Sequence, residues 1–72
     1  MPPPPSPDAV AFGARLRALR TARGWTQAQL AVLAGCSTGS LGKIERGRQV
    51  PHLKTIYALA RALGVETRAL VD

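Results

Sequence analysis

Acidic residues, aromatic residues, histidine and cysteine are all scarce in this sequence of 72 residues. With a single cysteine the chain cannot form an internal disulfide. One histidine, one cysteine and four scattered acids supply no carboxylate pair, no nucleophile beside a base and no zinc-ligand set. We therefore expect no enzyme activity, no metal and no cofactor.

The sequence also lacks long apolar runs. No run approaches the roughly 18 residues that a membrane-spanning helix needs. The opening residues, MPPPPSP, lack the basic-then-apolar order of a secretion signal. We therefore expect a cytoplasmic protein with no membrane contact. Only Phe12, Trp25 and Tyr57 are aromatic, so the core must consist mainly of Leu, Ile, Val and Ala, which suits a small helical bundle.

The shortage of acids leaves a large positive charge. Ten Lys and Arg against four Asp and Glu give a net charge of +6 and a pI of about 11.2. On one small domain this charge predicts an anionic partner. Charge alone leaves three candidates open: nucleic acid, an acidic protein and an anionic membrane surface.

Residues 1–7 are rich in proline, which has no amide hydrogen to donate and favours extended backbone. We interpret them as a disordered tail, and regard a ligand for a proline-binding domain as the less favoured alternative. Residues 8–72 are expected to form one domain. This length allows a single core of modest net stability.

The first helix is predicted to begin with a cap at Ser6 and to end at about Arg23, before Gly24. Its apolar stripe consists of Phe12, Leu16 and Leu19. Two further helices are predicted near the end of the chain, over about 53–63 and 66–70. The core positions expected in them are Leu53, Ile56, Ala60, Leu63, Val65 and Leu70, with Tyr57 beside the first four.

The central stretch from Thr26 to Gly47 organises the chain. Thr26 and Gln29 have the spacing of a capping box, and Trp25 and Leu30 have that of a hydrophobic staple, so a helix is expected to begin at about Gln27.

Ser37 repeats the signal eleven residues later and predicts a helix from about Thr38. Between the two predicted helices, Gly35 can adopt the positive φ that ends a helix. Leu41 and Ile44 supply an apolar face turned back toward the preceding helix. Two short helices joined by a tight turn form a helix-turn-helix.

These residues resemble the DNA-binding domains of phage repressors and Cro, the XRE-type family. The matching features are Thr-Gln at the first helix start, Ala31, Gly35, Leu41 and the closing Ile44-Glu45-Arg46-Gly47. The resemblance extends from about Phe12 to Leu70. It implies an all-α, compact five-helix bundle of the lambda-repressor type, with the helix-turn-helix at helices 2 and 3.

The resemblance further implies a regulator of transcription, a repressor by preference, that binds double-stranded DNA as a homodimer on an inverted repeat. In a helix-turn-helix the second helix enters the major groove and the preceding helix crosses the phosphate backbone. The residues expected to read bases are Thr38, Gly39, Ser40 and Lys43, of which Lys43 can donate to guanine. The residues expected to bind phosphates are Gln27, Ser37, Arg46, Arg48 and Lys54.

Arg20 and Glu45 are expected to form a structural ion pair. Glu45 is the only acid between Asp8 and Glu66. The resemblance implies that an arginine at the position of Arg20 pairs with it, tying the first helix to the third. From the residues alone, a solvated Arg20 is an equal alternative.

Gly39 and Gly42 depart from the family pattern, because both lie inside the predicted reading helix and neither offers a side chain to a base. They indicate either close approach of the backbone to DNA or shallow reading of sequence. The alternative function is therefore a protein-interaction module on the same bundle, docking an unidentified acidic partner.

Overall fold

The computed structural model describes residues 7–71, and this part of the chain contains five helices and no strand. In chain order they are α1 (Pro7–Ala22), α2 (Gln27–Ala34), α3 (Thr38–Glu45), α4 (Leu53–Leu63) and α5 (Arg68–Val71). The predicted all-α, five-helix bundle of the lambda-repressor type is confirmed.

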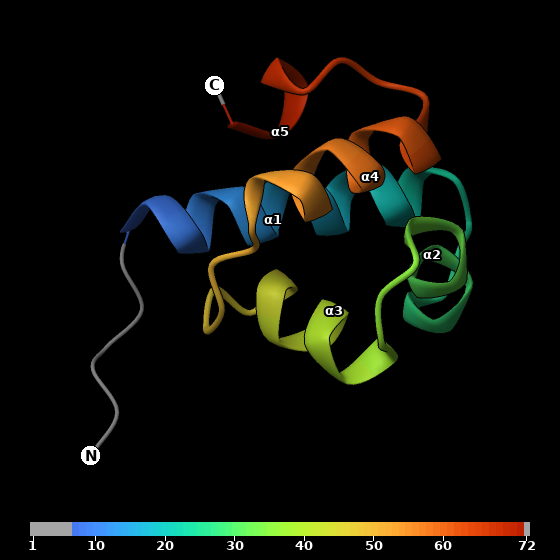
Figure 1. Ribbon diagram of the computed structural model, residues 1–72, viewed down its shortest axis with the longest axis horizontal. Helices are drawn as coiled ribbons and strands as arrows, with labels where there is room; N and C mark the ends of the chain where they lie inside the picture. Colours follow the sequence, from blue (N-terminus) through green and yellow to red (C-terminus); the bar gives the residue numbers. More distant parts are fainter. Residues whose placement is uncertain (1–6, 72) are drawn as a thin grey trace.

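The longest helix, α1, runs through the middle of the molecule and separates α3 from α5 (Figure 1). It contacts α3 on one side and α5 on the other, while α2 packs against both α3 and α4. This arrangement leaves the outer side of α3 at one edge of the molecule, away from α5 (Figure 1).

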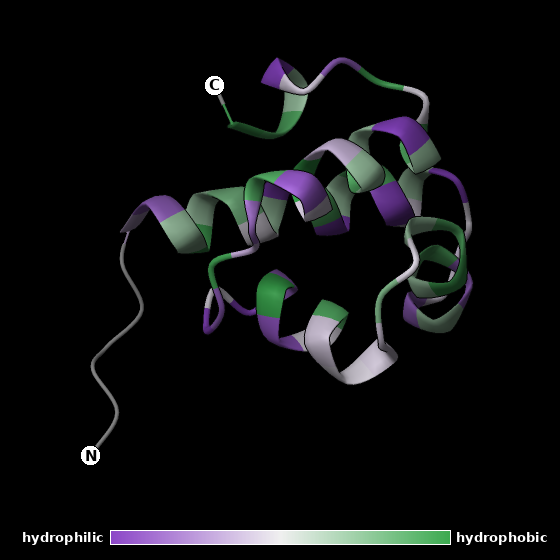
Figure 2. Ribbon diagram, viewed as in Figure 1, coloured by the Kyte–Doolittle hydropathy of each residue, from purple (hydrophilic) through white to green (hydrophobic). Residues whose placement is uncertain are grey.

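A single apolar core draws on every helix. Hydrophobic residues, drawn green, occur on all of the helices (Figure 2). Its buried members are Phe12, Leu16, Leu30, Ala31, Leu41, Ile44, Leu59, Ala60, Leu63 and Leu70. Leu19, Trp25, Cys36, Ile56 and Val65 are partly buried against them. Most of the apolar positions expected from the sequence therefore lie in the core.

The predicted core face of α4 was wrong at two positions. Leu53 is 60% exposed and Tyr57 is 52% exposed, whereas Leu59, which the prediction left out, is fully buried. Residues two apart in a helix point about 200° apart, so a face centred near Leu59 turns Tyr57 outward. Leu53, in the first turn, lies at the edge of that face.

Helix boundaries differ slightly from those predicted. α1 ends at Ala22 instead of Arg23, and α5 begins at Arg68 instead of Glu66. The Ala69 amide donates to the Glu66 carbonyl and the Leu70 amide to the Thr67 carbonyl. These bonds form a tight turn, after which the last helix begins. Pro7 is the first residue of α1, the position expected after a cap at Ser6; residues 1–6, with that expected cap, lie outside the described residues.

Gly13 allows α1 to pack directly on the end of α3. It is buried, and a Cβ atom there would overlap the carbonyl oxygen of Ile44 and lie 2.5 Å from that of Glu45. Gly47 meets the same helix, since its Cβ would lie 2.8 Å from the Val10 Cα. The backbones of α1 and of the end of α3 thus touch without intervening side chains.

We predict that Gly13→Ala lowers the free energy of unfolding by about 2–3 kcal/mol, because backbone carbonyls cannot move aside for the new methyl group. Thermal denaturation followed by circular dichroism measures this loss. Gly39→Ala is the matched control: nothing lies within 4 Å of its Cβ position, so it should stabilise the helix by about 0.5–1 kcal/mol. Equal melting temperatures for the two variants would contradict the close packing.

Candidate nucleic-acid interface

The start of α2 is fixed by the expected capping box. The Thr26 hydroxyl accepts a hydrogen bond from the Gln29 amide at 3.1 Å, and the Gln29 side chain accepts one from the Thr26 amide at 2.8 Å. Gly35 ends the helix with a φ of 72°. Local chemistry at both ends therefore sets the length of α2 and the direction in which the chain turns toward α3.

The start of α3 is fixed by Ser37, whose hydroxyl accepts a hydrogen bond from the Ser40 amide at 3.0 Å. Leu41 and Ile44 are buried beneath the helix. The opposite side of α3 faces solvent, and Thr38, Gly39 and Lys43 are exposed on it. Ser40 is half-buried, so it offers a ligand less surface than the other three residues that we expected to read bases.

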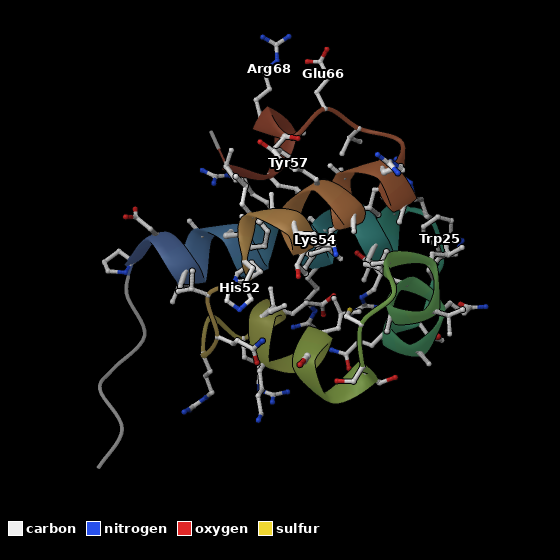
Figure 3. The ribbon with its side chains drawn as sticks, viewed as in Figure 1. Trp25, His52, Lys54, Tyr57, Glu66 and Arg68 are labelled. Atoms are coloured by element: carbon white, nitrogen blue, oxygen red, sulfur yellow. The ribbon has the colours of Figure 1, made fainter. Side chains whose placement is uncertain are left out.

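Positive side chains flank this exposed side of α3. Arg46 and Arg48 directly follow the helix, Lys54 lies in the first turn of α4, and all three are exposed. The helix and its flanks thus combine polar side chains with a cationic border, which suits an anionic duplex. Glu66 and Arg68 project from the opposite end of the molecule (Figure 3).

Arg20 and Glu45 form the expected ion pair in the interior. The Arg20 Nε lies 2.6 Å from Glu45 Oε2, and its Nη2 lies 3.0 Å from Oε1. Their side chains are 11% and 2% exposed. The hydrogen bond to Glu45 raises the pKa of Arg20 above its ordinary value, against the opposing effect of burial. The pair joins α1 to α3 and neutralises the one acid of α3.

The sequence did not reveal that Gln27 also binds Glu45. Its Nε2 donates to Glu45 Oε1 at 3.1 Å, so the side chain expected to bind phosphate is already anchored inside the domain. Gly42 was expected on the reading helix but is buried, facing this same glutamine. The spacing of helical residues puts Gly42 near the Leu41 side of α3, a signal that could have separated it from the exposed Gly39.

Residues 7–71 contain no group of three or more His, Cys, Asp and Glu that could hold a metal ion, and none of their helices is long and apolar enough to cross a membrane. Burial raises the pKa of the half-buried Cys36 thiol, which favours its neutral form. We interpret Cys36 as a packing residue.

The five-helix bundle, with α2 and α3 joined by a tight turn and cations beside the exposed side of α3, defines a helix-turn-helix DNA-binding domain. The family described as "Helix-turn-helix domain" matches residues 11–72. The chain belongs to this family of transcriptional regulators, of the XRE type, whose members are regulators and not enzymes.

Named relatives agree with this assignment. An immunity repressor protein of Bacillus phage phi105 is 46% identical over 86% of this chain and 43% of its own length. The restriction-modification controller protein C.AhdI of Aeromonas hydrophila has a TM-score of 0.88 at 46% identity, over 90% of this chain and 98% of that chain. The P22 c2 repressor, solved with a synthetic operator, has a TM-score of 0.81 at 30% identity, over 85% and 92%. The chain thus spans less than half of the phage phi105 relative.

We predict that Glu45→Ala destabilises the fold by about 2–4 kcal/mol, because the buried Arg20 guanidinium then lacks its partner. Chemical denaturation with urea measures the change. Glu66→Ala is the control, since it breaks an exposed pair with Arg68, at 2.7 Å, whose side chains are 72% and 80% exposed. An exposed pair contributes about 0–1 kcal/mol. Loss of stability no greater in Glu45→Ala than in Glu66→Ala would rule out a structural role for the buried pair.

Proposed function

We propose that this regulator binds double-stranded DNA sequence-specifically, with α3 in the major groove, and acts as a repressor in the cytoplasm. The observation that carries the proposal is the position of Lys43. It is exposed on α3, on the side opposite the buried Leu41 and Ile44, between cations that can meet the backbone. The P22 c2 repressor supports the proposal by its similarity, since its structure contains an operator.

Within this proposal, base reading falls mainly to Lys43 and Thr38. The lysine ammonium donates to guanine O6 or N7, while the threonine combines a hydroxyl with a methyl group that can pack on thymine. Gly39 allows the backbone of α3 to come close to the bases, because it has no side chain. Ser40 contributes less because it is half-buried.

Phosphate contacts then fall to Gln27, Arg46, Arg48 and Lys54, with the Ser37 hydroxyl at the start of α3. Each cation that meets a phosphate releases a counterion, so the affinity falls steeply with salt. The amides at the α2 start add donors and the positive end of a helix dipole. These contacts hold the domain on the duplex and carry no sequence information themselves.

We further propose that the protein binds an inverted repeat as a homodimer. One reading helix gives a small interface, and two α3 helices must lie about 34–36 Å apart to enter successive major grooves. We place the contact on the surface of α4 and α5 near Val65 to Val71. In the structure, Tyr57 and Val71 are 52% and 51% exposed. A largely apolar groove of about 460 Å³ is lined in part by Phe12, Ile56 and Val71.

The alternative of a protein-interaction module has one observation in its favour. Val32 and Leu33 on α2 are 80% and 57% exposed, beside Trp25 and Ala28. Docking to a protein predicts no operator preference, whereas DNA reading predicts affinities that depend both on salt and on sequence. Measuring the affinity for several duplexes at two salt concentrations separates the two functions.

We predict that selection of bound sequences from random duplexes yields a preferred site, and that Lys43→Ala loses the preference at one base pair at a cost of about 1–3 kcal/mol. Arg68→Ala is the control, because this cation lies at the opposite end of the molecule from α3 (Figure 3). It should leave the preferred site unchanged. A uniform loss across all sequences would make Lys43 a phosphate contact instead.

We predict that the footprint on the selected DNA covers two half-sites related by a two-fold axis. Tyr57→Asp should then weaken binding to the paired sites at least tenfold without lowering the melting temperature, because Tyr57 is half-exposed in a single copy. Footprinting measures the binding to the paired sites, sedimentation velocity measures the association of two copies, and thermal denaturation measures the melting temperature. A wild-type footprint over one half-site contradicts the homodimer.

A further inference from the structure

Gly42 leaves a notch on the side of α3 that faces α2. The residue is buried, and a Cβ atom there would lie 3.2 Å from Arg46 Nη1 and 3.5 Å from Gln27 Oε1. Contacts of 3.0–3.4 Å are tighter than most real Cβ contacts, so the Arg46 guanidinium would have to shift. Two side chains that we expect at DNA phosphates therefore converge above one glycine, one from α2 and one from the residue that directly follows α3.

The Gln27 side chain is held at its inner side only. One amide hydrogen is donated to Glu45 Oε1 at 3.1 Å, and Glu45 is held in turn by Arg20. The Gln27 amide has a second hydrogen, which can be donated to a phosphate oxygen. The Glu45 carboxylate holds this side chain from beneath, and Gly42, which has no side chain, leaves space beside it.

We propose that Gly42 is a positioning residue for DNA binding: because it has no side chain, the Arg46 guanidinium can lie against α3 beside the Gln27 amide and bind the phosphate backbone from there. The inference deepens the proposed function and rests on it. A methyl group at this position displaces the Arg46 guanidinium, while the Gln27 amide stays at an ordinary contact distance of 3.5 Å. DNA binding then requires the guanidinium to be reordered. The cost falls on affinity for every duplex, since phosphates are common to all sequences.

The test compares Gly42→Ala with Gly39→Ala, each alone and combined with Arg46→Ala. Both substitutions add one methyl group to α3, and only Gly39 has nothing within 4 Å of its Cβ position. Gly42→Ala should weaken DNA binding about tenfold, and this loss should largely disappear when Arg46 is already alanine. The effect of Gly39→Ala should be the same in both backgrounds.

Two further readouts separate positioning from damage to the fold. Gly42→Ala should not lower the melting temperature, because a helical alanine replaces a glycine and the nearest contact is the mobile end of Arg46. In the DNA-free protein, the side-chain Nε signal of Arg46 in a ¹⁵N-correlated NMR spectrum should shift with Gly42→Ala and not with Gly39→Ala.

Three results overturn the proposal: wild-type DNA affinity in Gly42→Ala, an equal loss with and without the Arg46 side chain, or a Gly42→Ala protein that does not fold. The last would show that the fold itself requires glycine at this position. If the wild-type protein binds no duplex, the proposed function fails. The NMR comparison then still decides whether Gly42 sets the position of the Arg46 guanidinium.

Discussion

The buried carboxylate of Glu45 is the point on which the rest of the structure depends. It receives hydrogen bonds from Arg20 of α1 and from Gln27 of α2, and it belongs to α3 itself. Burial of Leu41 and Ile44 turns the apolar side of α3 toward the core and so sets the rotation of the helix broadly. A two-pronged arginine pair is directional, so it narrows that rotation further. Which residues of α3 face outward therefore follows from apolar burial together with a polar contact inside the domain.

The same carboxylate shapes the electrostatics of the outer surface. Glu45 is the one acid of α3, and its charge is balanced internally by Arg20. Another acid, Glu66, pairs with Arg68 at the opposite end of the molecule from α3 (Figure 3). Lys43, Arg46 and Arg48 consequently border the exposed side of α3, and the one carboxylate of that helix is already paired with Arg20. Part of the net charge of +6 is thus concentrated beside α3, where it can attract an anionic duplex.

How far the sequence could predict the structure depended on the range of each interaction. The caps at Thr26 and Ser37 involve residues three apart, and both helix starts were predicted correctly from spacing. The face of α4 was not, because Leu59 and Tyr57 both have large, mainly apolar side chains and only the packing of α2 and α5 against α4 decides between them. The Gln27 to Glu45 hydrogen bond spans 18 residues and has no local pattern. The resemblance supplied the Arg20 pair, for which the residues alone left even odds.

Three glycines with the same helix penalty in sequence have three different roles in space. Gly13 allows the backbone of α1 to touch the end of α3, Gly42 makes room for two side chains, and Gly39 faces open solvent. Each lowers helix propensity by about the same amount relative to alanine. Their differing environments mean that the penalty is offset by packing at Gly13, and that at Gly39 nothing within the domain offsets it. Under the proposed function, the open backbone at Gly39 lets the start of α3 come close to the bases.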